Sequence, residues 1–182
     1  MPETDVQSTP PAPTTTTPAE RAARLARAET LVKDHMLMSA AVGLIPAPGL
    51  DIVAAMGIQI ALLKRLADLY EVPFSQHAAR GVVTSLLGGV GAGALAGGIF
   101  MSAVKLLPGA GTLFGVVSMP ISLAAVTYAV GKLFIAHFEL GGTLADFNAA
   151  AQRPYFKELV QRGRQVASTL TPSRTAKDPA KP

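Results

Sequence analysis

VVTSLLGGVGAGALAGGIFMSAV, residues 82–104, carries no charged side chain and holds six glycines. As an α-helix rising about 1.5 Å per residue, it would reach roughly 34 Å, which is enough to cross a hydrocarbon core of about 30 Å. In water, each glycine in a helix interior costs about 1 kcal/mol relative to alanine. We therefore expect lipid or another helix to cover this stretch.

The glycines of this stretch include a row spaced by four residues. In lipid, small residues at that spacing let another backbone approach closely, and van der Waals contact replaces the missing hydrophobic drive. We expect a helix–helix seam, within the chain or between chains, formed by Gly89, Gly93 and Gly97 with the parallel row Gly88, Ala92 and Ala96. The alternative is a Gly-rich core helix in a soluble bundle.

Working outward, proline and glycine mark two similar breaks between apolar helices. Neither residue type fits a helix interior cheaply. The predicted hairpin turns contain Pro46, Pro48 and Gly49 in the first break, and Pro108, Gly109 and Gly111 in the second. We therefore predict an all-α fold with two tandem apolar helical hairpins, an amphipathic N-terminal helix and C-terminal helices. The first hairpin covers about 36–63, and the second pairs 82–104 with 110–131.

A helical domain is predicted over residues 17–170, between two tails. Residues 1–16 are rich in Thr and Pro, and residues 171–182 are basic, so we expect both tails to be disordered. Thr17, Pro18 and Glu20 form a capping-box pattern that starts the first helix. Its apolar face is expected to carry Leu25, Ala28, Val32 and Met36.

Other local signals place the later helix ends. They are caps at Ser75 and Thr112, a kink at Pro120, and a helix end at Gly141-Gly142. The stretch Thr143–Asp146 follows a capping-box pattern and predicts a short helix. Pro154 is expected to open the last helix, which runs to about Leu170.

Asp51 interrupts the second arm of the first hairpin. An ionised Asp at the middle of a membrane costs about 2.5–3.5 kcal/mol on insertion scales. Close to the turn, its carboxylate could stay at the interface or cap the second helix. A buried polar site or an ion contact is the alternative.

The last helix carries apolar residues near one face with cations beside them. This arrangement is typical of a membrane-surface helix, and its predicted residues are Tyr155, Phe156, Arg153, Lys157, Arg162 and Arg164. The alternative is that the apolar face packs on the chain's own bundle.

Charge is scarce in the middle of the chain. Hydrophobic residues make up 49% and charged residues 15%, against about 25% charged in soluble domains. Between Met36 and Gly131 the charged residues are Asp51, Lys64, Arg65, Asp68, Glu71, Arg80 and Lys105. A segment with so little polar surface needs lipid or other protein chains to cover it.

The sequence offers no pattern for catalysis, metal binding or nucleic-acid binding. It has no cysteine, and its histidines, His35, His77 and His137, follow no ligand spacing, so we expect no metal site. It also lacks a nucleophile elbow, a Walker loop and a dinucleotide fingerprint, so we expect no enzyme and no cofactor. Without tryptophan it offers little stacking surface for nucleic acid, and an anionic lipid surface is the better match for its basic C-terminus.

The positions of the cations predict an orientation. The start of the chain is acidic and lacks the apolar core of a signal peptide. Lys64, Arg65 and Arg80 precede the second hairpin, Lys132 follows it, and Lys105 lies in its turn. Because cytoplasmic loops carry the excess of Lys and Arg, we expect the cytoplasmic (inner) membrane, with both termini facing the cytoplasm.

Two groups of residues resemble a known family. The first group is GLIPAPGLD at 43–51, Ile58-Gln59 and LADLYEVPF at 66–74; the second is KLLPGAGT at 105–112 and HFELGGTL at 137–144. They resemble the two halves of the YcjF-like family (domain of unknown function 697). The resemblance implies a bacterial, helical, membrane-associated module that often accompanies Era-like or dynamin-like GTPases and has no established catalytic residues.

These observations favour a non-enzymatic membrane scaffold or anchor. We expect it to contact membrane lipid, to form a homo-oligomer through its Gly-rich helix, and to partner a GTPase, as the resemblance implies. The first alternative is a soluble or peripheral homo-oligomer that buries its apolar helices between subunits. The second is an oligomeric pore, although no ring of charge marks a selectivity filter.

Overall fold

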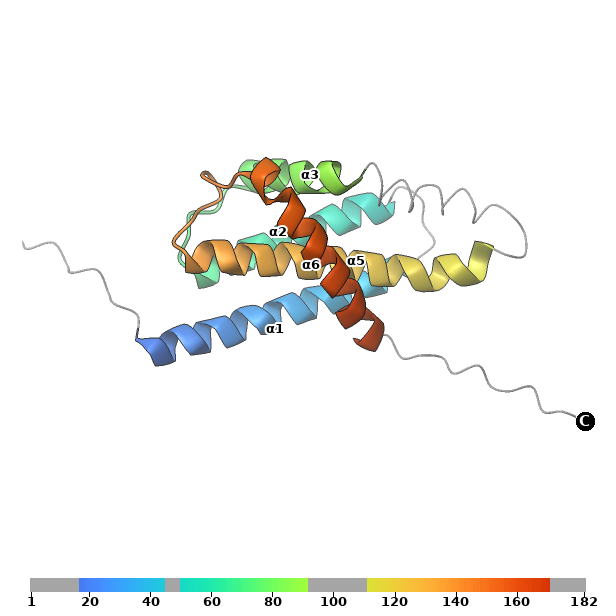
Figure 1. Ribbon diagram of the computed structural model, residues 1–182, viewed down its shortest axis with the longest axis horizontal. Coiled ribbons are helices and arrows are strands. Elements are labelled where there is room, and N and C mark those ends of the chain that lie inside the picture. Colours follow the sequence, from blue (N-terminus) through green and yellow to red (C-terminus); the bar gives the residue numbers. More distant parts are fainter. Residues whose placement is uncertain (1–16, 45–49, 92–110, 171–182) are drawn as a thin grey trace, which may run out of the picture.

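The computed structural model describes residues 17–44, 50–91 and 111–170 (Figure 1). These residues form five α-helices and no strand, which confirms the predicted all-α class. The helices are α1 (Pro18–Gly43), α2 (Leu50–Leu69), α3 (Gln76–Gly91), α5 (Gly111–Glu139) and α6 (Ala149–Leu170). Both predicted tails lie outside the described residues.

Figure 1 shows α1, α2, α3 and α5 side by side along the long axis, with α6 crossing them obliquely. The helix α5 is central, because it packs against α1, α2 and α6, whereas α3 packs against α2 and α6. The contact between α1 and α2 agrees with the first predicted hairpin. The turn of the second hairpin lies outside the described residues.

Large apolar side chains from all these helices fill one core. Its fully buried members include Val32 and Met36 of α1, Leu62 and Leu66 of α2, Leu86 of α3, Phe134 of α5 and Phe156 of α6. The predicted apolar face of α1 is confirmed at Ala28, Val32 and Met36, but Leu25 is 39% exposed. The burial of α5 explains its low charge, because a central helix must be apolar on most of its sides.

Several helix ends follow the local sequence signals. Thr17 Oγ1 accepts from the Glu20 amide at 3.2 Å, and Glu20 Oε2 accepts from the Thr17 amide at 2.7 Å, which confirms the capping box. Ser75 Oγ accepts from the Ala78 amide at 3.4 Å and caps α3. The helix α5 ends before Gly141-Gly142, as predicted, and Pro120 lies inside it. The kink at Pro120 stays a prediction.

Other predicted helix starts are wrong. Residues 144–146 form a bend, and no helix starts at Thr143. Asn148 caps α6 instead, because its Oδ1 accepts from the Ala151 amide at 3.1 Å, so Pro154 lies in the second turn and does not open the helix. The helix α5 begins at Gly111, so Gly111 does not lie in the predicted turn and Thr112 is not the cap.

Three isolated glycines let the helices approach closely. Gly43 of α1 lies against Pro120 of α5, where an added Cβ would stand 2.7 Å from the Pro120 Cα. Gly131 of α5 lies against Val32 of α1. Gly163 of α6 lies against Ala125 of α5, with 2.7 Å from an added Cβ to the Ala125 carbonyl oxygen. Among the described residues, these close approaches between helices lie outside the row of glycines spaced by four residues that the sequence indicated.

Candidate functional site

The charged residues divide the bundle into two ends. In α1 no Asp, Glu, Lys or Arg follows Asp34, in α2 none lies over 52–63, in α3 none follows Arg80, and in α5 none precedes Lys132. Consecutive helices from α1 to α5 alternate in direction (Figure 1), so these uncharged segments all lie at the same end of the bundle, and Asp51 in the first turn of α2 lies there too. We call this the apolar end. The opposite, polar end holds the start of α1 and the connections 70–75 and 140–148.

At the polar end, a cluster of charged and aromatic groups joins α1, α2 and α5. Arg21 Nε lies 2.5 Å from Glu139 Oε2, and Arg24 Nε lies 3.8 Å from Glu139 Oε1. The Arg24 guanidinium also stands over the Tyr70 ring, 4.8 Å from its centroid. The Glu139 carboxylate is mostly buried, so the two arginines offset the cost of removing its charge from water.

The Tyr70 phenol is buried beside this carboxylate. Burial, followed by the nearby Glu139, raises the pKa of Tyr70 above its ordinary value of 10.0, and Arg24 opposes part of this shift. The phenol therefore stays protonated at neutral pH. Among the described residues, neither its hydroxyl nor Glu139 Oε1 meets a partner at hydrogen-bonding geometry, although the two groups are close enough to influence each other.

The end of α5 is shaped by its two glycines. Gly141 has φ +81°, a left-handed conformation that glycine adopts without a Cβ penalty. The Gly141 amide donates to the Phe138 carbonyl at 2.9 Å and the Gly142 amide to the His137 carbonyl at 3.0 Å, which together form a Schellman motif. An added Cβ on Gly142 would collide with the His137 ring, so the second glycine lets the chain turn over that ring.

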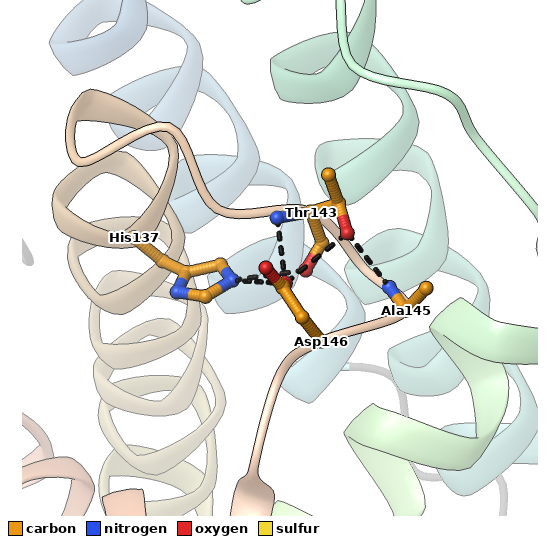
Figure 2. Close-up of polar contacts among 4 residues, drawn as sticks. All are labelled: His137, Thr143, Ala145 and Asp146. Atoms are coloured by element: carbon orange, nitrogen blue, oxygen red, sulfur yellow. Dashed lines mark hydrogen bonds and ion pairs between the residues drawn. The ribbon is translucent and has the colours of Figure 1, made fainter.

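His137 then holds the loop that leads to α6 (Figure 2). Its Nε2 lies 2.9 Å from the Thr143 carbonyl oxygen and 3.1 Å from Asp146 Oδ1. Both partners are acceptors, so Nε2 is the protonated nitrogen. Asp146 Oδ1 also accepts from the Thr143 amide at 2.7 Å and from the Thr143 hydroxyl at 3.1 Å. His137, Thr143 and Asp146 together clasp the loop between α5 and α6.

The clasp predicts a specific pH dependence. The Thr143 amide, outweighing burial and helped by the Thr143 hydroxyl and His137, holds the pKa of Asp146 below its ordinary 3.8. A lowered pKa in the folded state gives stability that is present above the unfolded pKa and is lost as pH falls through the folded one. We expect Asp146→Asn to be less stable than the parent near neutral pH, and the difference to close only below about pH 4. Urea titrations at a series of pH values measure this gap, and a gap that persists through the acid range would rule out a role for the ionised carboxylate.

A second polar group lies buried in the uncharged half of the bundle. Thr127 Oγ1 of α5 lies 2.6 Å from Ser39 Oγ of α1, accepts from Gln59 Nε2 of α2 at 2.8 Å, and donates to the Leu123 carbonyl at 3.0 Å. One hydroxyl has one proton, so Ser39 must donate to Thr127. This hub ties three helices together, and the sequence reasoning missed it. Its signal was Gln59, an amide in the middle of an apolar stretch of α2.

Many of the predicted site residues lie outside the described residues: Gly93, Gly97, Ala92, Ala96, Pro46, Pro48, Gly49, Pro108 and Gly109. Gly88 and Gly89 lie in the last turn of α3. An added Cβ on Gly88 would meet no atom within 4 Å, so this position does not serve as a seam within the described bundle. Asp51 is the second residue of α2 and therefore lies inside the helix, after the capping position.

The structure places the apolar face of α6 against α5 and α3, which is the alternative to a membrane-surface helix. Phe156 is fully buried, and Arg153 donates to the Ser85 carbonyl of α3 at 3.5 Å. Arg162 pairs with Glu158 at 2.6 Å. Tyr155, Lys157 and Arg164 point outward and are exposed. A contact of α6 with lipid stays a prediction, and it would be made by the exposed face that carries these three residues.

Within the described ranges, no three His, Asp or Glu side chains gather as metal ligands.

The family described as Domain of unknown function (DUF697) matches residues 19–167. This chain belongs to the DUF697 family. The resemblance seen in the sequence is thereby confirmed. Magnetosome membrane protein 22 of Magnetospirillum gryphiswaldense is 36% identical over 149 residues, which cover 82% of this chain and 76% of that protein. No solved structure matches the chain significantly.

Two of the DUF697 motif segments meet at the polar end. Residues 66–74 supply Tyr70, and residues 137–144 supply His137, Phe138 and the clasped loop. The Tyr70 and Phe138 rings lie 5.8 Å apart, centroid to centroid. The motifs therefore encode the local turns and long-range contacts of one end of the bundle.

One helix segment among the described residues, Met119–Glu139, is long and apolar enough to cross a membrane. In the bundle, 56% of its apolar window is buried, as expected for a central helix. This segment and the membrane-protein relative fit a membrane-associated helical protein.

Proposed function

We propose that this protein is a non-enzymatic membrane scaffold that places its apolar end in the membrane and presents its polar end to a partner. The observation that carries the proposal is the gathering, at one end, of long uncharged segments from four helices, where Asp51 in the first turn of α2 lies at the tip. A soluble bundle has no reason to sort its charges along its long axis. A bundle that meets a membrane end-on does, because each charge moved into hydrocarbon costs several kcal/mol.

Exposed apolar side chains support this orientation. At the apolar end, Leu37, Met38, Leu44 and Val53 all lie exposed, and Val53 reaches 70%. Water contact with this group is unfavourable by about 25 cal/mol for each Å² of apolar surface. Insertion into lipid removes that cost without rearranging the core. The relative's name as a magnetosome membrane protein points the same way.

Finer features belong to the same proposal. An added Cβ on Gly88 would meet no neighbouring atom. We suggest that Gly88 belongs to the predicted row of small residues and that this row joins two copies of the chain. A cross-linking ladder in membranes that is unchanged by Gly93→Leu would argue against this seam.

The charged polar end would face the cytoplasm at the inner membrane, with both termini, and offer its connections to a GTPase. If a GTPase still co-purified with the chain after the polar end was disrupted, the polar end would not be its binding surface.

A matched pair of substitutions tests the orientation. Val53→Glu adds a charge to an exposed apolar side chain at the apolar end, and Leu140→Glu does the same at the polar end, where Leu140 is 87% exposed. A charge in the membrane costs about 2.5–3.5 kcal/mol at its centre, and tenfold in binding corresponds to about 1.4 kcal/mol. We expect Val53→Glu to weaken vesicle flotation at least tenfold and Leu140→Glu to leave it unchanged.

Alkaline carbonate washing of cell membranes provides the second measurement. The parent chain is expected to stay in the membrane pellet. Release into the supernatant, together with equal flotation of both variants, would instead favour the soluble or peripheral homo-oligomer.

A further inference from the structure

A groove of about 310 Å³ runs between α2 and α3. This volume is at the lower end of the range for small-molecule sites. Met56, Gly57 and Ile60 line it from α2, and Phe74 lines it from the connection to α3. Gly57 has no side chain and meets no neighbouring atom within 4 Å of an added Cβ, so the groove stays open at this point.

The groove has a cationic part and an apolar part. Lys64 lines it from α2, and Arg80 lines it from the second turn of α3. Lys64 pairs with Asp68 at 2.9 Å, and its ammonium lies 5.9 Å from the centroid of the Phe74 ring. Arg80 makes no ion pair with any described residue. No acidic side chain of the described residues lines the groove, so an anion there would meet two cations and no opposing carboxylate among them.

The apolar part leads along α2 toward the apolar end of the bundle. Positions 53, 56, 57, 60 and 64 share one face of the helix, because they are three or four residues apart. Val53, the next residue on this face beyond the groove, is largely exposed. A ligand with its charge at Lys64 would therefore extend its apolar portion toward the surface that we assign to the membrane.

We infer that this groove binds one anionic phospholipid, with its phosphate near Lys64 and Arg80 and an acyl chain along Gly57 and Ile60. The inference rests on the proposed membrane function and names a ligand for it. Arg and Lys bind phosphate through charge-assisted hydrogen bonds. Gln76 adds one uncharged polar side chain to the lining. A lipid still fits better than an acidic peptide, because the face of α2 beyond the groove continues to the exposed apolar side chain of Val53, which matches an acyl chain.

Two glycines offer a matched test. Gly57 and Gly81 are both exposed, lie inside helices, and leave open space for an added Cβ. Only Gly57 lines the groove. Leucine favours a helix more than glycine does, so Gly57→Leu and Gly81→Leu should both fold with unchanged or higher melting temperature. The leucine at 57 fills the groove without altering the net charge.

The measurement is flotation of the full chain with phosphatidylcholine vesicles that contain or lack phosphatidylglycerol. We expect the parent to favour phosphatidylglycerol by several-fold, and Gly81→Leu to keep that preference. Gly57→Leu and the double variant Lys64→Ala, Arg80→Ala should lose most of it. Equal preference in the parent and in Gly57→Leu would overturn the groove site. Failure of the parent to float with either vesicle would instead overturn the membrane function.

A tryptophan reporter locates the lipid, since the chain contains no native tryptophan. Phosphatidylglycerol with brominated acyl chains should quench the fluorescence of Phe74→Trp. The quenching should disappear when Gly57→Leu is added, and it should be weak for Leu140→Trp at the polar end. Similar quenching of both reporters would contradict the inference. A change in the fluorescence of Phe74→Trp on adding an acidic peptide, with no effect of lipid, would also contradict it and would assign the groove to a protein partner.

Discussion

Thr127→Val is expected to lower the free energy of unfolding by about 2–5 kcal/mol, although it barely changes the volume of the side chain. The hydroxyl of Thr127 is fully buried and accepts from both Ser39 and Gln59. Valine leaves both donors without their partner, and each unpaired buried polar group costs about 1–3 kcal/mol. The loss of the hydrogen bond is expected to cost most at Gln59, because its Oε1 already lacks a partner within the described bundle.

A compensating variant separates lost polar contacts from lost packing. In Thr127→Val combined with Gln59→Leu and Ser39→Ala, the stranded donors are gone, and replacing all partners by apolar groups of similar shape can be nearly neutral. We expect the triple variant to recover most of the stability lost by Thr127→Val. Urea or thermal unfolding followed by circular dichroism measures all of these proteins. If Thr127→Val alone stays within about 0.5 kcal/mol of the parent, the hub does not hold the three helices together.

Local hydrogen-bond signals predicted helix ends where a few adjacent residues decide the outcome. The Thr17–Glu20 box and the Gly141-Gly142 end depend on contacts within one turn, so the sequence alone suffices. The Thr143–Asp146 pattern failed for an instructive reason. Asp146 does accept from the Thr143 amide, as in a capping box, but His137 also binds that carboxylate, and the residues close a loop instead of starting a helix.

The polar contacts between helices could not be predicted in this way. Arg21 and Glu139 lie 118 positions apart, and Ser39 and Thr127 lie 88 apart. Neither pair follows from helical periodicity, because pairing depends on which helices become neighbours. The sequence identified α5 as apolar, but the same composition suits a membrane span and the centre of a bundle. The described packing shows that α5 takes the central position here.

The two ends of the bundle are held by different interactions. Ion pairs, a cation–aromatic contact and the His137 clasp fix the polar end, which is the end that we propose to face a partner. The apolar half relies on the Thr127 hub and on close helix contacts. Hydrogen bonds between helices remain effective in lipid, where hydrophobic packing gives little drive for helices to associate. The hub therefore suits a bundle whose apolar end enters a membrane.

Gly163→Ala should also destabilise the bundle, by about 1–3 kcal/mol, despite the better helix propensity of alanine. The new Cβ would stand 2.7 Å from the carbonyl oxygen of Ala125 and 2.9 Å from its Cα. Both are backbone atoms of α5, so no rotamer change relieves the collision, and α6 must move away from α5. The movement would also loosen Phe156, which is fully buried between these helices.

Gly81→Ala is the matched control, because its Cβ meets no atom within 4 Å. Relief of the glycine penalty alone should stabilise it by about 0.5–1 kcal/mol. The same substitution is thus expected to change stability in opposite directions at two helical positions of one chain. Gly163→Leu should be worse than Gly163→Ala, since a longer side chain forces a wider separation. If both alanine variants were stabilised equally in unfolding measurements, α6 would not pack on α5 at this distance. The conclusion that the apolar face of α6 is buried against α5 would then be wrong.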